Sequence, residues 1–149
     1  MTDRTMVGMT IGPRSIVFER APLKLFCKAI GETNPLFTDE VTARAAGHRD
    51  LQAPLTYLFA LKTAVIFPTE MNEHIGIKQE LGRLFHAEQA FQYTRRAYVG
   101  DRLTFVEKLI DVYDKKDGEL TFIVSETAVT NQDAEEVATL RFSMVRTNT

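Results

Sequence analysis

The segment at residues 55–67 constrains the fold more than any other part of the chain, because it is almost entirely apolar and lies between two prolines. Proline is tolerated in the first turn of a helix and ends a helix that reaches it, so we expect a helix that Pro54 opens and Pro68 stops. Lys62 is the only charged residue inside it, which predicts a helix buried nearly all round. The segment is too short to span a bilayer, so it should form the centre of a globular core.

Four strand candidates follow this helix, at residues 85–96, 102–113, 120–129 and 137–146. The turns expected between them are Gly100-Asp101, a hairpin at 115–118 and a turn at 131–133. In the first of these strands, alternation puts Phe85, Ala87, Phe91 and Tyr93 on one face and His86, Glu88 and Gln92 on the other. His86 is therefore expected at the surface or at an interface, with a role as a replacement acid or base as the alternative. An apolar helix followed by long antiparallel strands predicts an α+β fold in which a sheet curls around a helix.

The first half of the chain is expected to be mainly helical, after a short strand at 15–20. Pro22 occupies a position that a first helical turn tolerates, and residues 22, 25, 26, 29 and 30 form one apolar face. Gly31 should end that helix. Thr38 is read as the N-cap of a second, short helix that reaches about Ala46. Residues 69–83 are expected to form an irregular connection with one helical turn.

The composition is that of one soluble globular domain covering residues 1–149, with 44% apolar and 26% charged residues. A net charge of −2 gives no general attraction for nucleic acid or anionic membrane. The single cysteine, Cys27, excludes an internal disulfide and fits a reducing compartment. No signal peptide is apparent in the first residues, so we expect a cytoplasmic protein. His48 and His74 have no partner at metal-ligand spacing, so no metal site is expected.

Residues 31–37 read Gly-Glu-Thr-Asn-Pro-Leu-Phe. This heptapeptide resembles the G-D-x-N-P-(L/I/V)-H core of the MaoC-like family of (R)-specific enoyl hydratases and (3R)-hydroxyacyl dehydratases. Glu32 stands where the family has its catalytic Asp, and Phe37 stands where it has its catalytic His. The resemblance implies the hotdog fold, in which a long antiparallel sheet wraps a central apolar helix, here at about 54–67.

Three further segments are similar to the FAS1-like, N-terminal-type branch of the same family. Residues 52–57 read Q-A-P-L-T-Y where catalytic members have A-H-G-M-x. Residues 86–91 resemble an H-G-E-Q-x-F strand, and residues 98–103 resemble an R-x-G-D-x-L turn. That branch includes non-catalytic subunits of heterodimeric mycobacterial (3R)-hydroxyacyl dehydratases.

Syn-hydration of a trans-2-enoyl thioester needs a base to activate water, an acid to protonate the α-carbon and donors for the enolate oxygen. In the family the motif Asp and His supply the base and the acid, and a backbone N–H at the start of the helix helps to supply the donors. Glu32 keeps a carboxylate but adds one methylene, and a shift of about 1 Å can cost on the order of 100-fold in rate. Phe37 cannot take or give a proton. The donor position aligns with Leu55, and the preceding Pro54 has no N–H.

The resemblance also implies a set of substrate-binding candidates, namely Asn34, Pro54, Leu55, Thr56, Arg95 and Arg96. Each candidate has a plainer interpretation. Asn34 can bond its own backbone as a turn residue instead of lining an acyl channel. The two arginines can be solvated instead of contacting coenzyme A phosphates. Glu32 can be a solvated residue after a helix end, and Phe37 can be a core or channel-wall residue.

Three functions remain open. The first, which we favour, is a non-catalytic MaoC-like subunit that pairs its sheet with a catalytic hotdog chain and shapes the acyl tunnel. The second is a self-sufficient hydratase, dehydratase or other hotdog thioester enzyme that uses Glu32 as its base. The third is an acyl-thioester-binding module without turnover. All three imply a thioester of coenzyme A or of an acyl carrier as ligand, with no separate cofactor. A homodimer or a heterodimer with a catalytic chain is expected, without nucleic acid or membrane.

Overall fold

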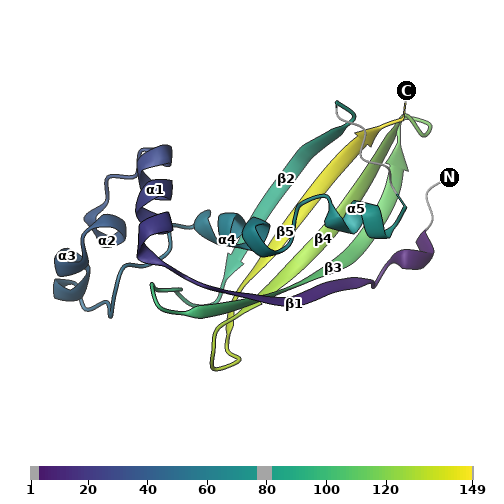
Figure 1. The fold of residues 1–149 in the computed structure, drawn as a ribbon. Helices are drawn as coiled ribbons and strands as arrows, with labels where there is room; N and C mark the ends of the chain where they lie inside the picture. Colours follow the sequence, from purple (N-terminus) through teal and green to yellow (C-terminus); the bar gives the residue numbers. More distant parts are fainter. Residues whose placement is uncertain (1–3, 77–81, 149) are drawn as a thin grey trace.

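The computed structural model describes residues 4–76 and 82–148. Its centre is a five-stranded antiparallel sheet in the order β1-β3-β4-β5-β2. The strands are β1 (Thr10–Val17), β2 (Leu84–Tyr93), β3 (Arg102–Lys115), β4 (Leu120–Thr130) and β5 (Glu136–Thr147). The helices are η1 (Arg4–Met6), α1 (Arg20–Ile30), α2 (Pro35–Thr38), α3 (Glu40–Ala45), α4 (Tyr57–Val65) and α5 (Glu70–His74). Figure 1 shows α4 and α5 along one face of the sheet, with α1 to α3 grouped to one side.

The apolar helix exists as α4, but it is shorter than the expected 54–67. It begins at Tyr57 because residues 54–56 form a turn, in which the Tyr57 N–H donates to the Pro54 carbonyl at 2.9 Å. It ends at Val65, and the next residue, Ile66, is already extended at φ −126° and ψ 109°. The residue before a proline is steered away from helix, which explains an end ahead of Pro68. Burial is also less complete than expected, since the flanking Leu55 is 67% exposed.

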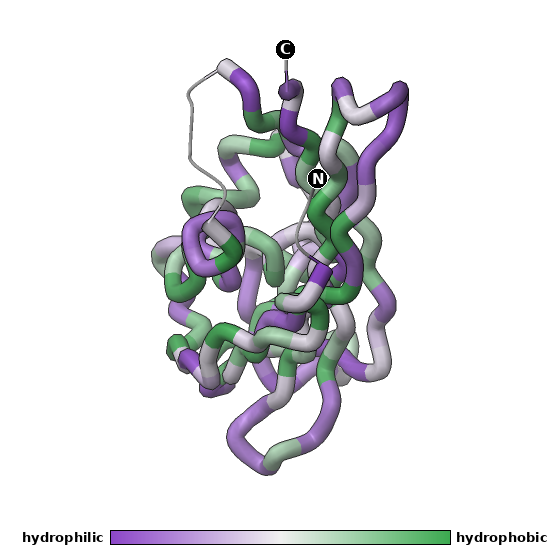
Figure 2. Tube along the Cα trace, turned by 90° about the vertical axis from the view of Figure 1, so that its right-hand side faces the viewer, coloured by the Kyte–Doolittle hydropathy of each residue, from purple (hydrophilic) through white to green (hydrophobic). Residues whose placement is uncertain are grey.

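The core lies between α4 and the sheet. Leu58 and Leu61 of α4 are buried against a row of strand residues that includes Leu103, Phe105 and Leu109 of β3. Buried and less buried positions alternate along most of β3, and Figure 2 shows the hairpin tips as hydrophilic. This alternation is what a sheet with one buried face requires. Within the described ranges no helix is both long and apolar enough to cross a membrane.

The face assignment predicted for β2 is wrong at its start. The pairing with β5 runs from His86 opposite Met144 to Glu88 opposite Ser143, so Ala87 is an extra residue that forms a bulge. A bulge reverses the alternation from that point. His86 therefore lies on the same side as Phe91, facing α4, where its ring stacks on Phe59 at a centroid distance of 5.8 Å.

The first half contains the expected helices with different boundaries. The first strand, β1, starts at Thr10, earlier than the expected residue 15. Gly31 ends α1 in the left-handed conformation at φ 69°, as predicted. Thr38 does not cap the next helix. Instead Asn34 caps the short α2, and the carboxylate of Asp39 accepts from the Thr42 N–H at 3.1 Å as the cap of α3.

The second half follows the expected order of strands. The hairpin between β3 and β4 is confirmed, with Lys116 and Asp117 at φ 51° and 52°. Gly118 follows at φ 92°, so three consecutive residues of this loop adopt positive φ, and Lys115 and Leu120 pair on either side of it. In the connection at 69–83, α5 is the single helical turn that was expected. Residues 77–81 of that connection lie outside the described residues.

Candidate functional site

The motif at residues 31–37 forms the turn after α1 and the first part of α2. The Glu32 carboxylate accepts a hydrogen bond from the Asn34 N–H at 2.8 Å, and the Asn34 side-chain oxygen accepts from the Leu36 N–H at 3.0 Å. Asn34 thereby serves as the N-cap of α2, with Pro35 in the first helical position, where proline is favoured. Both polar side chains of the motif are thus engaged in holding the local backbone.

Phe37 lies in α2, half-buried, and packs against the core. It lines a cavity of about 400 Å³ together with Leu55, Arg95 and Arg96. The cavity lies where α2, the turn before α4 and the segment after β2 meet. Four of the eight residues singled out from the sequence are therefore brought together at one place. Its size falls within the range of about 300–1,000 Å³ that is common for small-molecule sites.

The other four singled-out residues do not line this cavity. Pro54 and Thr56 flank Leu55 in the turn before α4, Pro54 buried and Thr56 exposed. Glu32 and Asn34 lie in the preceding turn, where their side chains bond to backbone N–H groups. The carboxylate and the residue at the family's His position thus point to different surroundings in this chain.

Both arginines of the cavity have partners within the chain. Arg95 donates through Nε to the Glu136 carbonyl at 2.8 Å and forms an ion pair with Glu135 at 2.7 Å. Arg96 donates to the side-chain oxygen of Gln52, which is 2% exposed. These contacts tie the segment after β2 to the β4–β5 turn and to the strand-like segment before α4. The guanidinium groups therefore stiffen the cavity wall.

Tyr93 is one of five cavity residues that were not predicted from the sequence, because its position in the strand pattern marked it only as apolar. Its ring stacks on Phe91 at 6.1 Å, and its hydroxyl is buried without a hydrogen-bond partner in the described part of the chain. Burial raises the pKa of Tyr93 to about 12, so the hydroxyl stays protonated at neutral pH. A buried hydroxyl with no partner carries a free-energy cost that a bound acceptor would relieve.

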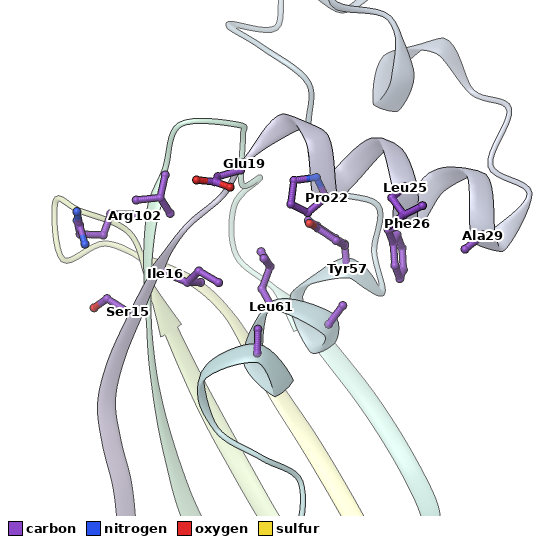
Figure 3. A pocket seen from close by; sticks show the side chains of 13 residues that line it. Ser15, Ile16, Glu19, Pro22, Leu25, Phe26, Ala29, Tyr57, Leu61 and Arg102 are labelled. Carbon is purple, nitrogen blue, oxygen red and sulfur yellow. The ribbon is translucent and has the colours of Figure 1, made fainter.

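A second, larger cavity lies elsewhere, between α1, α4 and β1 (Figure 3). Its volume is about 750 Å³, and its walls are mainly apolar. It shares no lining residue with the cavity at Phe37. Across residues 4–76 and 82–148, no three His, Cys, Asp or Glu side chains gather in a way that could hold a metal ion.

Comparison with known proteins assigns this fold to a family. Residues 5–140 match the model of the FAS1-like, dehydratase domain region. The chain belongs to this FAS1-like dehydratase family. The sequence-based assignment to MaoC-like hotdog dehydratases is therefore confirmed. A UPF0336 protein of Streptomyces griseus subsp. griseus is 33% identical over 103 residues, which cover 68% of this chain and 67% of that protein.

Solved structures show the same hotdog fold. The FAS1-like chain superposes with a TM-score of 0.77 on a chain of the C-terminally truncated HadBC (3R-hydroxyacyl-ACP dehydratase) complex from Mycobacterium tuberculosis. The two are 22% identical, and the match covers 95% of this chain and 98% of that one. A MaoC-like dehydratase gives a TM-score of 0.82 at 20% identity, over 96% of this chain and 42% of the other. The expected α+β hotdog fold is thus confirmed.

Proposed function

We propose that this chain is a non-catalytic, channel-forming subunit of a cytoplasmic enzyme that interconverts trans-2-enoyl and (3R)-hydroxyacyl thioesters. A partner chain supplies the acid and the base, and the substrate is an acyl thioester of coenzyme A or of an acyl carrier, with no further cofactor. The observation that carries this proposal is what occupies the two catalytic positions of the motif. Its carboxylate is bonded to the Asn34 backbone, and its His position is occupied by Phe37 in a cavity wall.

The chemistry of hydration supports a subunit that does not turn over substrate by itself. Each positioned acid or base contributes typically about 100- to 10,000-fold in rate. Phe37 removes one such group. Glu32 does not line the Phe37 cavity, so its carboxylate is not positioned to activate a water molecule there. A chain that lacks both contributions retains the surface that binds an acyl group and loses most of the rate.

A comparison of the two edge strands of the sheet, β1 and β2, favours association through β2. At the other edge, β1 carries a register shift between Ile11 and Arg14. Gly12 adopts φ +103° there, and a Cβ at this position would lie 2.6 Å from the Phe105 carbonyl oxygen. Bulges of this kind blunt an edge. The bulge of β2, at Ala87, lies near the start of that strand and leaves Glu88 to Tyr93 in regular register with β5. Among residues 4–76 and 82–148, β2 pairs with β5 alone, and Phe85 on β2 is 49% exposed.

The position of the Phe37 cavity agrees with such an association. Its wall includes Tyr93 and the residues that follow it, at the end of β2. A partner strand added alongside β2 would therefore lie next to the cavity. The chain would contribute Phe37, Leu55 and Tyr93 to a shared acyl channel, and the Tyr93 hydroxyl would donate to a substrate oxygen. The partner would contribute the Asp and His of an intact G-D-x-N-P-x-H motif.

The test is purification of the chain from its native host, followed by hydratase assays of the chain alone and of the chain with any hotdog protein that accompanies it. We expect activity in the complex only. Leu55→Trp, which fills the cavity, should lower the activity of the complex. Val41→Trp is the matched control, because Val41 is 77% exposed on α3 and does not line the cavity. Equal activities of the two variants would contradict a role of this cavity in the channel. Thioester binding without turnover, even in the complex, would favour a binding module.

A further inference from the structure

The cavity at Phe37 carries positive charge in its walls. Apolar residues line one part of it, and the short run from Tyr93 to Arg96 supplies most of its polar groups. Among the described residues that line it, none is Asp or Glu, and two are arginines. The charge that a ligand meets there depends on whether each guanidinium group is already neutralised within the chain.

Arg95 is neutralised by a carboxylate of the chain itself. Its guanidinium lies 2.7 Å from the Glu135 carboxylate and also donates to the Glu136 carbonyl at 2.8 Å. Hydrogen bonds from Asn131 and from Arg95 lower the pKa of Glu135, so this carboxylate is ionised at neutral pH. An anionic ligand at Arg95 would have to compete with Glu135, which the chain holds in the same place.

Arg96 keeps an uncompensated positive charge. Its hydrogen-bond partner is the side-chain oxygen of Gln52, a neutral acceptor that is 2% exposed, and it has no ion pair within residues 4–76 and 82–148. A guanidinium group has five N–H donors in a rigid fork, so the bond to Gln52 leaves other donors free. Because Gln52 is buried, it also holds the guanidinium in place before a ligand arrives, which lowers the cost of binding.

Burial changes along the same run and gives a ligand its direction. The Tyr93 hydroxyl is buried without a hydrogen-bond partner in the described part of the chain, whereas Arg96 is exposed. An anion bound to Arg96 would therefore lie at the surface, and the body of the same ligand would extend inward, to the Tyr93 hydroxyl and the apolar walls at Phe37 and Leu55.

We propose that Arg96 binds the phosphate of the phosphopantetheine arm on which the acyl thioester is carried. This rests on the proposed function, in which the substrate is a thioester of coenzyme A or of an acyl carrier. Both hold the acyl group on the same arm, and its phosphate suits a guanidinium group through charge-assisted hydrogen bonds. One uncompensated cation matches one phosphate, so the nucleotide part of coenzyme A finds no further charged partner in the described walls of this cavity.

The test is calorimetric titration of the full chain, purified with any hotdog protein that accompanies it, with three butyryl thioesters. A butyryl group is saturated and cannot be hydrated. Butyryl-4′-phosphopantetheine should bind at least about fivefold more tightly than butyryl-pantetheine, which lacks the phosphate, a modest preference because Arg96 is exposed. Butyryl-CoA should bind as tightly as butyryl-4′-phosphopantetheine. Raised salt should reduce the preference, because it screens exposed charges.

Two variants locate the phosphate. Arg96→Gln should remove the preference for the phosphorylated arm, and unchanged binding of butyryl-pantetheine shows that its cavity is intact. Arg102→Gln is the matched control and should keep the preference. Arg102 also has no ion pair in the described part of the chain, but it lines the larger cavity between α1, α4 and β1.

Three results would overturn the proposal. They are equal binding or no binding of the two arms, a preference that survives in Arg96→Gln, and much tighter binding of butyryl-CoA than of butyryl-4′-phosphopantetheine. Each of these is a binding measurement. Hydration of crotonyl-CoA by the isolated chain would contradict the proposed function and leave the phosphate preference as it is, so the two failures can be told apart.

Discussion

The ammonium group of Lys62 lies 2.8 Å from Oε2 of Glu107, and the two side chains are 2% and 1% exposed. Ser125 donates to the other carboxylate oxygen at 2.5 Å, and the Phe142 ring lies 5.4 Å from the ammonium group. Lys62 Nζ and Glu107 Oε2 have no hydrogen-bond partner in the described part of the chain, so the ion pair is their main polar contact. The only charge on the apolar helix is thus neutralised by β3, which fixes how the helix sits on the sheet.

Removal of one member of this pair should be far more costly than removal of both. Lys62→Met leaves the Glu107 carboxylate buried and uncompensated, a loss of about 3–5 kcal/mol in the free energy of unfolding. In Lys62→Met/Glu107→Gln the buried charge is gone, and an amide remains to bond Ser125, so much of the loss should be recovered. Urea unfolding of the two single variants and the double variant measures the coupling. Additive losses would show that the ion pair does not couple α4 to the sheet.

The central position of α4 predicts different effects of one substitution at two sites on the same helix. Leu61 is 5% exposed, and an aspartate there would bury an unpaired carboxylate, at a cost of several kcal/mol. We expect Leu61→Asp to abolish cooperative folding. Ala64 is exposed, so Ala64→Asp should melt close to the wild type. Circular dichroism melting compares the two, and a soluble, cooperatively melting Leu61→Asp variant would argue against this helix as the centre of the fold.

Asp50 should stabilise the fold only above acidic pH. Burial alone would raise its pKa, but hydrogen bonds from Arg20 and from the Leu51 N–H outweigh burial and lower it. A folded-state pKa below the unfolded value of about 3.9 means that the stabilisation is full above that value and is lost as the pH falls through the folded pKa. Asp50→Asn should therefore lower Tm at neutral pH, with a smaller difference from wild type below about pH 4.

The control for this pH dependence is Asp117→Asn, at the exposed tip of the β3–β4 hairpin, where asparagine tolerates the positive φ. Its Tm difference from wild type should be small at every pH. An Asp50→Asn difference that stays constant from neutral pH to about pH 3 would contradict the role of the ionised carboxylate.

The order of the elements could be predicted from the sequence because proline, glycine and strand alternation are local signals. The partner of Lys62 could not, since Glu107 lies far along the chain and occupies a strand position that the alternation alone marks only as inward-facing. The bulge at Ala87 was also hidden, because it is defined by pairing with β5 and not by any residue type. It reversed the predicted face of His86.

Part of the candidate site could be predicted, because two of the motif positions lie side by side in the folded chain. Phe37 and Leu55 reach the same cavity because the turn after α1 and the turn before α4 are adjacent in the hotdog fold. The use of Glu32 inside its own turn depends on the position of the Asn34 backbone N–H, which the sequence does not encode separately. The Tyr93 hydroxyl was missed because an aromatic residue in a strand reads as apolar until its surroundings are known.

The open edge at β2 predicts that the chain is not a monomer. An edge strand with a regular stretch, such as Glu88 to Tyr93 beyond the Ala87 bulge, is normally paired or covered, and a two-fold or pseudo-two-fold partner would extend the sheet across β2. Light scattering at micromolar concentration should give about twice the 16.9 kDa mass of one chain, or the mass of a complex with a second hotdog chain. A mass of one chain, with no partner present, would contradict this expectation.

The account rests on the claim that the isolated chain lacks a working acid–base pair, and hydration of crotonyl-CoA by the purified chain tests this most directly. We expect turnover far below the roughly 1–1,000 per second typical of enzymes, and the same residual rate in Glu32→Ala, since that carboxylate bonds the Asn34 backbone instead of a reacting water. Ordinary enzyme rates in the wild type that are lost in Glu32→Ala would contradict the account and identify Glu32 as the general base.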